Sequence, residues 1–134
     1  MAHTVLLVDT DLMFIEQTRQ RLLDAGYRVL CAQSQAEAET ILSRSKPDVL
    51  VSEVLLERPD GGFCLAWSAK RRYPEMPVLL VSTVTWHTGL YFSLSRPEDH
   101  AWIKADAFID KPIRYEELES AIRRFLQASH RTSA

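Results

Sequence analysis

Polar side chains that can bind an ion or hold a charged group stand at the ends of several apolar runs of this sequence. They are three acids, one hydroxyl and one lysine: Asp9, Asp11, Glu53, Ser82 and Lys111. Each has a simpler explanation when it is taken alone, because Asp9 or Asp11 could cap a helix and Lys111 could neutralise a surface acid. Five such residues at the ends of apolar runs are harder to attribute to chance, so we treat them as one candidate site.

The elements that must position this site alternate between strands and helices. Apolar runs predict strands over residues 4–8, 27–31, 49–54, 77–82 and 107–110. Helical spacing predicts helices from 12 to Gly26, from a capping box at Ser34, over about 63–72 after a turn at 59–62, and through the stripe Leu118, Ile122, Phe125 and Leu126. Strands joined by helices call for a parallel sheet covered on both faces. We therefore predict a doubly wound, five-stranded α/β domain with its site outside the carboxyl ends of the strands.

Composition limits the classes of protein to consider. With 134 residues, of which 46% are hydrophobic, the chain can form one domain with its own core, which we place at residues 1–128 with a frayed tail at 129–134. A net charge of −2 argues against a nucleic-acid or membrane partner, and no run is long enough to span a bilayer. Cys31 and Cys64 lack metal-ligand spacing, and we expect both to be buried thiols of a cytoplasmic protein.

Five motifs along the chain carry a family resemblance. "VLLVDTD", "PDVLVSEV", "RPDGGF", "MPVLLVST" and "ADAFIDKPI" occur in the order and spacing found in the receiver domain of two-component response regulators. The match covers nearly the whole chain. The resemblance implies a flavodoxin-like sheet with strand order 2-1-3-4-5.

The resemblance also assigns roles to individual positions. In the family, an acidic pair and an aspartate ending the third strand bind magnesium, and that aspartate accepts a phosphoryl group from a histidine kinase. Asp9 matches the first acid of the pair, and Phe108 falls at the aromatic switch position. The phosphate-contacting positions are matched by Ser82 with Thr83 after it, Lys111 and its cis-proline Pro112.

Two positions depart from the family pattern. Thr10 stands in place of the second acid, and Glu53 stands in place of the phosphoacceptor aspartate. Phosphoryl transfer depends on positioning, so an oxygen displaced by one methylene is misplaced for in-line attack. Magnesium prefers compact oxygen coordination, and a threonine removes one full charge from it. At most, Asp9, Asp11 and Glu53 would bind Mg²⁺ weakly, with Asp11 compensating in part.

Three classes of function remain open. The first is a pseudo-receiver, a non-enzymatic signalling module that binds a histidine kinase or a downstream signalling protein and could form a homodimer. Within it, Glu53 either imitates the phosphorylated state or forms a plain ion pair with Lys111. The second is a working receiver that accepts a phosphoryl group with Mg²⁺. The third, a flavin-binding protein, is disfavoured because "DTDLMF" places carboxylates where a phosphate would lie.

The segment 83–107 is longer than its counterpart in the family by about two helical turns. It is rich in aromatic side chains: Trp86, Tyr91, Phe92 and Trp102. Such a cluster either forms an exposed recognition patch or folds back over the core. His87 and His100 flank it without a partner at zinc-ligand spacing, so we expect surface histidines.

Overall fold

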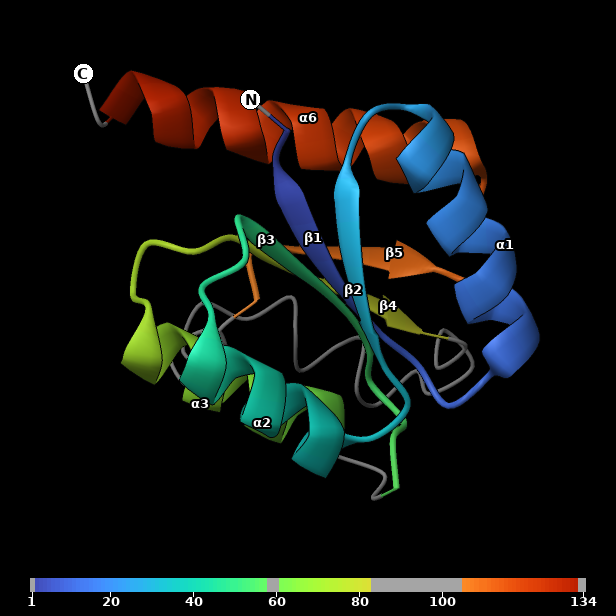
Figure 1. Cartoon of the computed structure of the whole chain (residues 1–134), viewed down its shortest axis with the longest axis vertical. Coiled ribbons are helices and arrows are strands. Elements are labelled where there is room, and N and C mark those ends of the chain that lie inside the picture. The colour runs from blue at the N-terminus through green and yellow to red at the C-terminus, as the bar shows by residue number, and fades with distance from the viewer. Residues whose placement is uncertain (1, 58–60, 83–104, 133–134) are drawn as a thin grey trace.

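The computed structural model describes residues 2–57, 61–82 and 105–132, and its architecture is a parallel sheet between two layers of helices (Figure 1). The elements are β1 (Thr4–Val8), α1 (Leu12–Asp24), β2 (Arg28–Ala32), α2 (Gln35–Arg44), β3 (Val49–Glu53), α3 (Gly61–Arg72), β4 (Val78–Ser82), β5 (Ala107–Asp110) and α6 (Tyr115–Thr132). The five strands pair in parallel in the order β2-β1-β3-β4-β5. The predicted fold class and strand order are confirmed.

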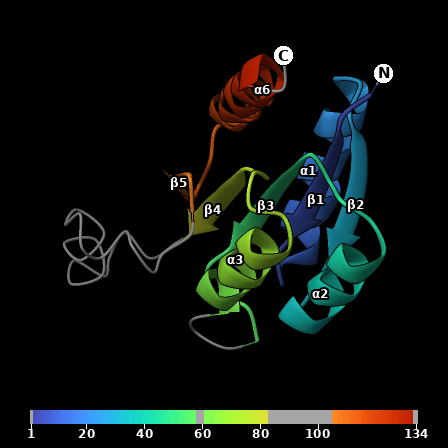
Figure 2. The ribbon, with the colours of Figure 1, turned by 90° about the vertical axis from the view of Figure 1, so that its left-hand side faces the viewer.

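Two hydrophobic clusters hold the helices to opposite faces of the sheet. On one face Leu6 and Val8 pack with residues of α2 and α3, whereas on the other Val5 and Leu7 pack with residues of α1 and α6. Figure 2 shows these two pairs of helices on either side of the strands. Successive side chains of a strand point to opposite faces, so a strand buried on both sides must be apolar at every position. This is why the β1 sequence "TVLLV" shows no polar alternation.

The pairing register brings the ends of the strands to one edge of the sheet. Val8 of β1 lies beside Ser52, and Glu53 at the end of β3 lies beside Val81. Ser82 at the end of β4 lies beside Asp110 at the end of β5. Because the strands are parallel, the residues that follow them emerge at the same edge, as the sequence predicted.

Local signals fix where the first helices begin and end. The Asp11 side chain caps α1, and the Ser34 hydroxyl caps α2 by accepting from the backbone N–H of Glu37. Gly26, with φ of 96°, adopts the left-handed conformation just after α1. These three residues account for the early alternation of strand and helix.

Several boundaries differ from the sequence prediction. β2 begins at Arg28 rather than at 27, and α3 begins at Gly61, within the predicted turn. α6 continues to Thr132, beyond the expected start of the tail at 129, while the division into domain and tail stays a prediction. Residues 127–132 contain neither glycine nor proline to stop a helix.

The prediction that both cysteines are buried is wrong for Cys64 and holds only in part for Cys31. Cys31 is partly buried, but Cys64 is exposed. Cys64 lies between Phe63 and Leu65, which are both buried, and a helix turns its intervening side chain outward. An apolar neighbourhood in the sequence was therefore a poor guide to burial on this helix.

The predictions for 83–104 lie outside the described residues. They concern Thr83, the aromatic cluster and both flanking histidines. Within the described residues, no helix combines the length and apolar character that crossing a membrane requires.

Candidate functional site

Three of the predicted site residues meet at the carboxyl edge of the sheet. Asp9 follows β1, Glu53 ends β3 and Lys111 follows β5. The Lys111 ammonium lies 2.6 Å from Asp9 Oδ2 and 3.5 Å from Glu53 Oε2. The sequence thus located a charge cluster whose members are 102 positions apart at most.

Lys111 is held mainly by Asp9. The ammonium donates a hydrogen bond to Asp9 Oδ2, while its contact with Glu53 at 3.5 Å is an ion pair without a hydrogen bond. Its Nζ also lies 4.3 Å from the centre of the Phe14 ring, within reach of a cation–π interaction. The Lys111–Pro112 peptide bond is cis, in agreement with the family pattern.

Glu53 is a buried carboxylate with an incomplete set of partners. The residue is 4% exposed, and its Oε2 accepts no hydrogen bond from the described residues. Burial raises the pKa of the Glu53 carboxyl, the nearby Lys111 opposes that rise, and the charge of Asp9 adds to it. The Lys111 ammonium is therefore the shared partner of two buried carboxylates, and it lies closer to Asp9 than to Glu53.

The Asp11 side chain serves the helix rather than the charge cluster. Its Oδ1 accepts hydrogen bonds from the backbone N–H groups of Met13 and Phe14. The Asp11 backbone N–H in turn donates to Asp9 Oδ1 at 2.9 Å. The simple capping explanation holds for Asp11, and both oxygens of Asp9 are engaged by protein donors.

The described acids are a poorer set of magnesium ligands than the family pattern implies. Asp9 is occupied at both oxygens, Asp11 is used as a cap, and Thr10 is exposed and carries no charge. Across the described parts of the chain, no group of three His, Cys, Asp or Glu side chains could hold a metal ion. Magnesium keeps several waters and is usually held by one or two carboxylates, so a site here would have few protein oxygens to hold it.

The remaining predicted residues lie around this centre. Ser82 ends β4 as expected, although its side chain is outside the described atoms, as is the whole of Thr83. Phe108 lies on β5, is 39% exposed, and has its ring centre 6.2 Å from that of Phe63 on α3. These placements match the positions that the resemblance assigned, while the roles stay predictions.

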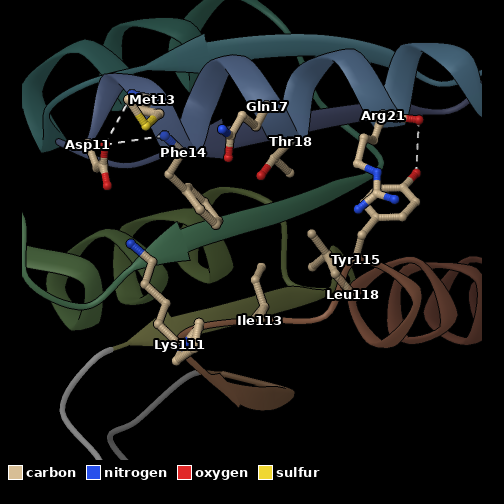
Figure 3. A pocket seen from close by; sticks show the side chains of 11 residues that line it. Asp11, Met13, Phe14, Gln17, Thr18, Arg21, Lys111, Ile113, Tyr115 and Leu118 are labelled. Atoms are coloured by element: carbon tan, nitrogen blue, oxygen red, sulfur yellow. Dashed lines mark hydrogen bonds between the residues drawn. The ribbon is translucent and has the colours of Figure 1, made fainter.

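A groove of about 460 Å³ runs from Lys111 along α1, and it was not predicted from the sequence. Figure 3 shows Asp11, Phe14 and Lys111 near one end and Arg21 with Tyr115 at the other. The Tyr115 hydroxyl donates to the Arg21 carbonyl oxygen, and the Arg21 guanidinium lies over the Tyr115 ring. The signal for Phe14 was its place in the first turn after the Asp11 cap, which lies near the strand ends.

A family model matches the sequence of this chain and agrees with the geometry of the site. The model of the response regulator receiver domain matches residues 5–123. The chain belongs to this family. Among solved structures, a CheY-like receiver domain protein from Methanospirillum hungatei has a TM-score of 0.84 at 23% identity, covering 98% of this chain and 99% of its own. The receiver domain of a signal transduction histidine kinase from Syntrophus aciditrophicus has a TM-score of 0.75 at 28% identity, covering 95% of this receiver and 92% of its own chain.

Curated relatives of this receiver are longer proteins. The transcriptional regulatory protein GlrR of Escherichia coli is 30% identical over 128 residues, which make up 96% of this chain and 27% of that protein. The response regulator MprA of Mycobacterium leprae is 29% identical over 123 residues, which make up 92% of this chain and 50% of that protein. The receiver thus spans between a quarter and a half of the length of these relatives.

Proposed function

We propose that this receiver is a pseudo-receiver: a signalling module of a two-component system that binds proteins and is not phosphorylated at Glu53. One observation carries the proposal. Asp9 and Lys111 are hydrogen-bonded to each other, and Glu53 is buried beside them with Oε2 lacking a hydrogen bond from the described residues. The Lys111 ammonium, which would contact a phosphoryl group in the family, is already paired with Asp9 and lies near Glu53.

The chemistry of the transfer explains why this arrangement disfavours it. Forming an acyl phosphate requires a carboxylate oxygen in line with the bond to the leaving group of the phosphodonor, and cations to neutralise the phosphoryl oxygens. Glu53 is 4% exposed and longer than aspartate by one methylene, so its oxygens are both shielded and displaced. A phosphate would compete with Asp9, which already accepts a hydrogen bond from the Lys111 ammonium.

Magnesium would supply the missing positive charge in a working receiver. The described acids do not fit it, so we propose that the protein binds no magnesium, or binds it only weakly through Asp9, Asp11 and Glu53. The protein would then act without catalysis, through the surfaces that it presents to other proteins.

The alternative is a working receiver that still accepts a phosphoryl group. The observation that favours it is the 2.6 Å contact between Lys111 and Asp9, two residues that match the family pattern in sequence. Within the pseudo-receiver, imitation of the phosphorylated form by Glu53 draws support from the 3.5 Å contact between Glu53 Oε2 and the Lys111 ammonium. A carboxylate carries about one negative charge where a phosphoryl group carries nearly two, so the imitation would be partial.

Phosphodonor labelling separates these functions. Incubation with acetyl phosphate and Mg²⁺, followed by mass spectrometry, should leave wild-type Glu53 unmodified. The double variant Thr10→Asp with Glu53→Asp restores both family acids and should gain a phosphoryl group, which shows that the assay detects one. A stable acyl phosphate at wild-type Glu53 would establish the working receiver instead.

Partner binding then distinguishes imitation of phosphorylation by Glu53 from a plain ion pair between Glu53 and Lys111. We expect the partner to be a histidine kinase or a downstream signalling protein in the cytoplasm, with a homodimer as a further form. Wild type, Glu53→Asp and Glu53→Gln should differ in affinity for that partner if the charge and length of Glu53 imitate phosphorylation. Equal affinities would leave the plain ion pair.

A further inference from the structure

The outer surface of α2 and α3 carries an exposed tryptophan among cations, away from the Glu53 site. Trp67 is 46% exposed, and the Arg71 guanidinium lies 5.1 Å from the centre of its ring. Lys46, after the end of α2, lies 5.9 Å from the centre of the Tyr73 ring. We define the α2–α3 patch as Lys46, Trp67, Arg71, Arg72 and Tyr73.

The patch is continuous across the two helices, which lie side by side (Figure 2). A hollow of about 310 Å³ is lined by Leu42 from α2 and by Trp67, Arg71 and Arg72 from α3. The carbonyl oxygen of the same Leu42 accepts a hydrogen bond from the Tyr73 hydroxyl at 2.6 Å. A second hollow of about 390 Å³ lies against Trp67, Arg71 and Pro74, so Trp67 borders both.

The cations of the patch are available to an anionic partner. Lys70 pairs with Asp106 at 2.7 Å, but no ion pair to Lys46, Arg71 or Arg72 occurs among the described residues. Cations at the end of a helix also complement its dipole, which explains their position on α3. That effect does not account for a half-exposed tryptophan between two hollows.

We propose that the α2–α3 patch docks an acidic segment of a partner protein, with an apolar side chain of that segment packed against Trp67. Exposed tryptophan and arginine are the residues that most often dominate binding energy at protein interfaces. Charge complementarity selects the partner, because this surface is positive on a chain whose net charge is −2. The patch is separate from the Glu53 site, and the proposal does not depend on whether Glu53 is phosphorylated.

The observations favour an acidic peptide over a nucleic acid. Proteins that bind DNA commonly neutralise about six to ten phosphates, and the patch offers only Lys46, Arg71 and Arg72. Glu39 lines the same hollow as Arg72, so the acidic groups of the segment would lie over Arg71 and Arg72 and its apolar side chain against Trp67. A hollow of this size suits single side chains rather than a duplex.

Fluorescence anisotropy with a fluorescein-labelled peptide of alternating glutamate and leucine tests the proposal on the full chain. Arg71→Glu and Trp67→Ala should each weaken binding by about tenfold or more, the loss expected for a central contact. Arg124→Glu makes the same charge change at an exposed position on α6 and should weaken binding by less than about twofold. Circular dichroism checks that each variant is folded.

The same titrations give the outcomes that would overturn the proposal. Absence of binding by the wild type, or an equal loss in Arg124→Glu, would show that the patch does not select an acidic segment. Tighter binding of a single-stranded DNA of equal charge would assign the patch to nucleic acid. Loss of binding in Arg71→Glu with retention in Trp67→Ala would reduce the site to charge alone and remove the apolar contact.

Discussion

Lys111 decides the character of the site because it has two buried carboxylates to satisfy. It donates to Asp9 at 2.6 Å and leaves Glu53 at 3.5 Å, so the ammonium neutralises one acid well and the other poorly. A buried polar atom without a hydrogen bond costs about 1–3 kcal/mol. We infer that the glutamate is kept at some expense of stability, as is common at functional positions.

Glu53→Gln should therefore unfold at higher denaturant than wild type at neutral pH, by about 1 kcal/mol in the free energy of unfolding. The pKa of Glu53 is raised above its ordinary value of 4.5, so the folded protein holds this proton more tightly than the unfolded chain. Stability from Glu53 is then present at low pH and is lost as pH rises above 4.5 through the folded pKa. The gap between the variant and wild type should shrink as pH falls, measured by urea unfolding at several pH values.

Glu75→Gln is the matched control, since Glu75 is exposed and the same change there should leave the gap flat. A gap for Glu53→Gln that is equally flat across pH would contradict the assignment of a raised pKa.

The sequence predicted where the site residues lie in the fold, but it predicted less well which side chains contact each other. Strand ends located Asp9, Glu53 and Lys111 correctly, because parallel strands bring their carboxyl ends to one edge. The sequence did not show that Asp9 would hold Lys111 more closely than Glu53 does, or that Phe14 would lie over the ammonium. Such choices depend on distances of about an ångström, which are set by side-chain packing and leave no trace in residue spacing.

At the scale of elements, α3 is fixed by the close approach of its first turn to the end of β3. The Gly62 N–H donates to the Val54 carbonyl oxygen at 2.8 Å, and a Cβ on Gly62 would lie 2.5 Å from Val54 Cα and nearer still to the Glu53 carbonyl oxygen. Glycine is read from a sequence as a turn residue, so the helix start at Gly61 was missed. Here glycine is required by contact rather than by conformation.

Gly62→Ala should lower the free energy of unfolding by about 3 kcal/mol, because overpacking against backbone outweighs the better helix propensity of alanine. Gly26→Ala is the contrast: it has open space but a φ of 96°, and should cost only about 1 kcal/mol. Chemical denaturation of the two variants beside wild type gives the order. Equal stability of Gly62→Ala and wild type would show that β3 and α3 are not held in this contact.

At the scale of the whole molecule, the fold was predictable because each level of the sequence agreed with the next. Apolar runs, capping residues and helical spacing all favoured one parallel sheet, and the two core clusters confirm it. The end of α6 was missed because a helix can continue past its apolar stripe wherever nothing stops it. The described residues thus form the fold of a receiver, and at the edge of its sheet Thr10 and Glu53 depart from the family pattern.

A ligand that binds the folded receiver but not the unfolded chain raises the unfolding temperature. Thermal unfolding with Mg²⁺ therefore tests whether Thr10 and Glu53 have weakened the metal site. Magnesium at about a hundred times its Kd would add about 2.7 kcal/mol, a shift of several degrees for a domain of this size. We expect the wild type to shift by less than about one degree with Mg²⁺, alone or with beryllofluoride, since its acids do not form a metal site. Thr10→Asp restores the missing charge, and Glu53→Asp restores the acceptor. We expect the unfolding temperature to rise by several degrees with beryllofluoride and Mg²⁺ only in the double variant. A shift of several degrees in the wild type would mean that Asp9 can release Lys111 and that the receiver retains its switch.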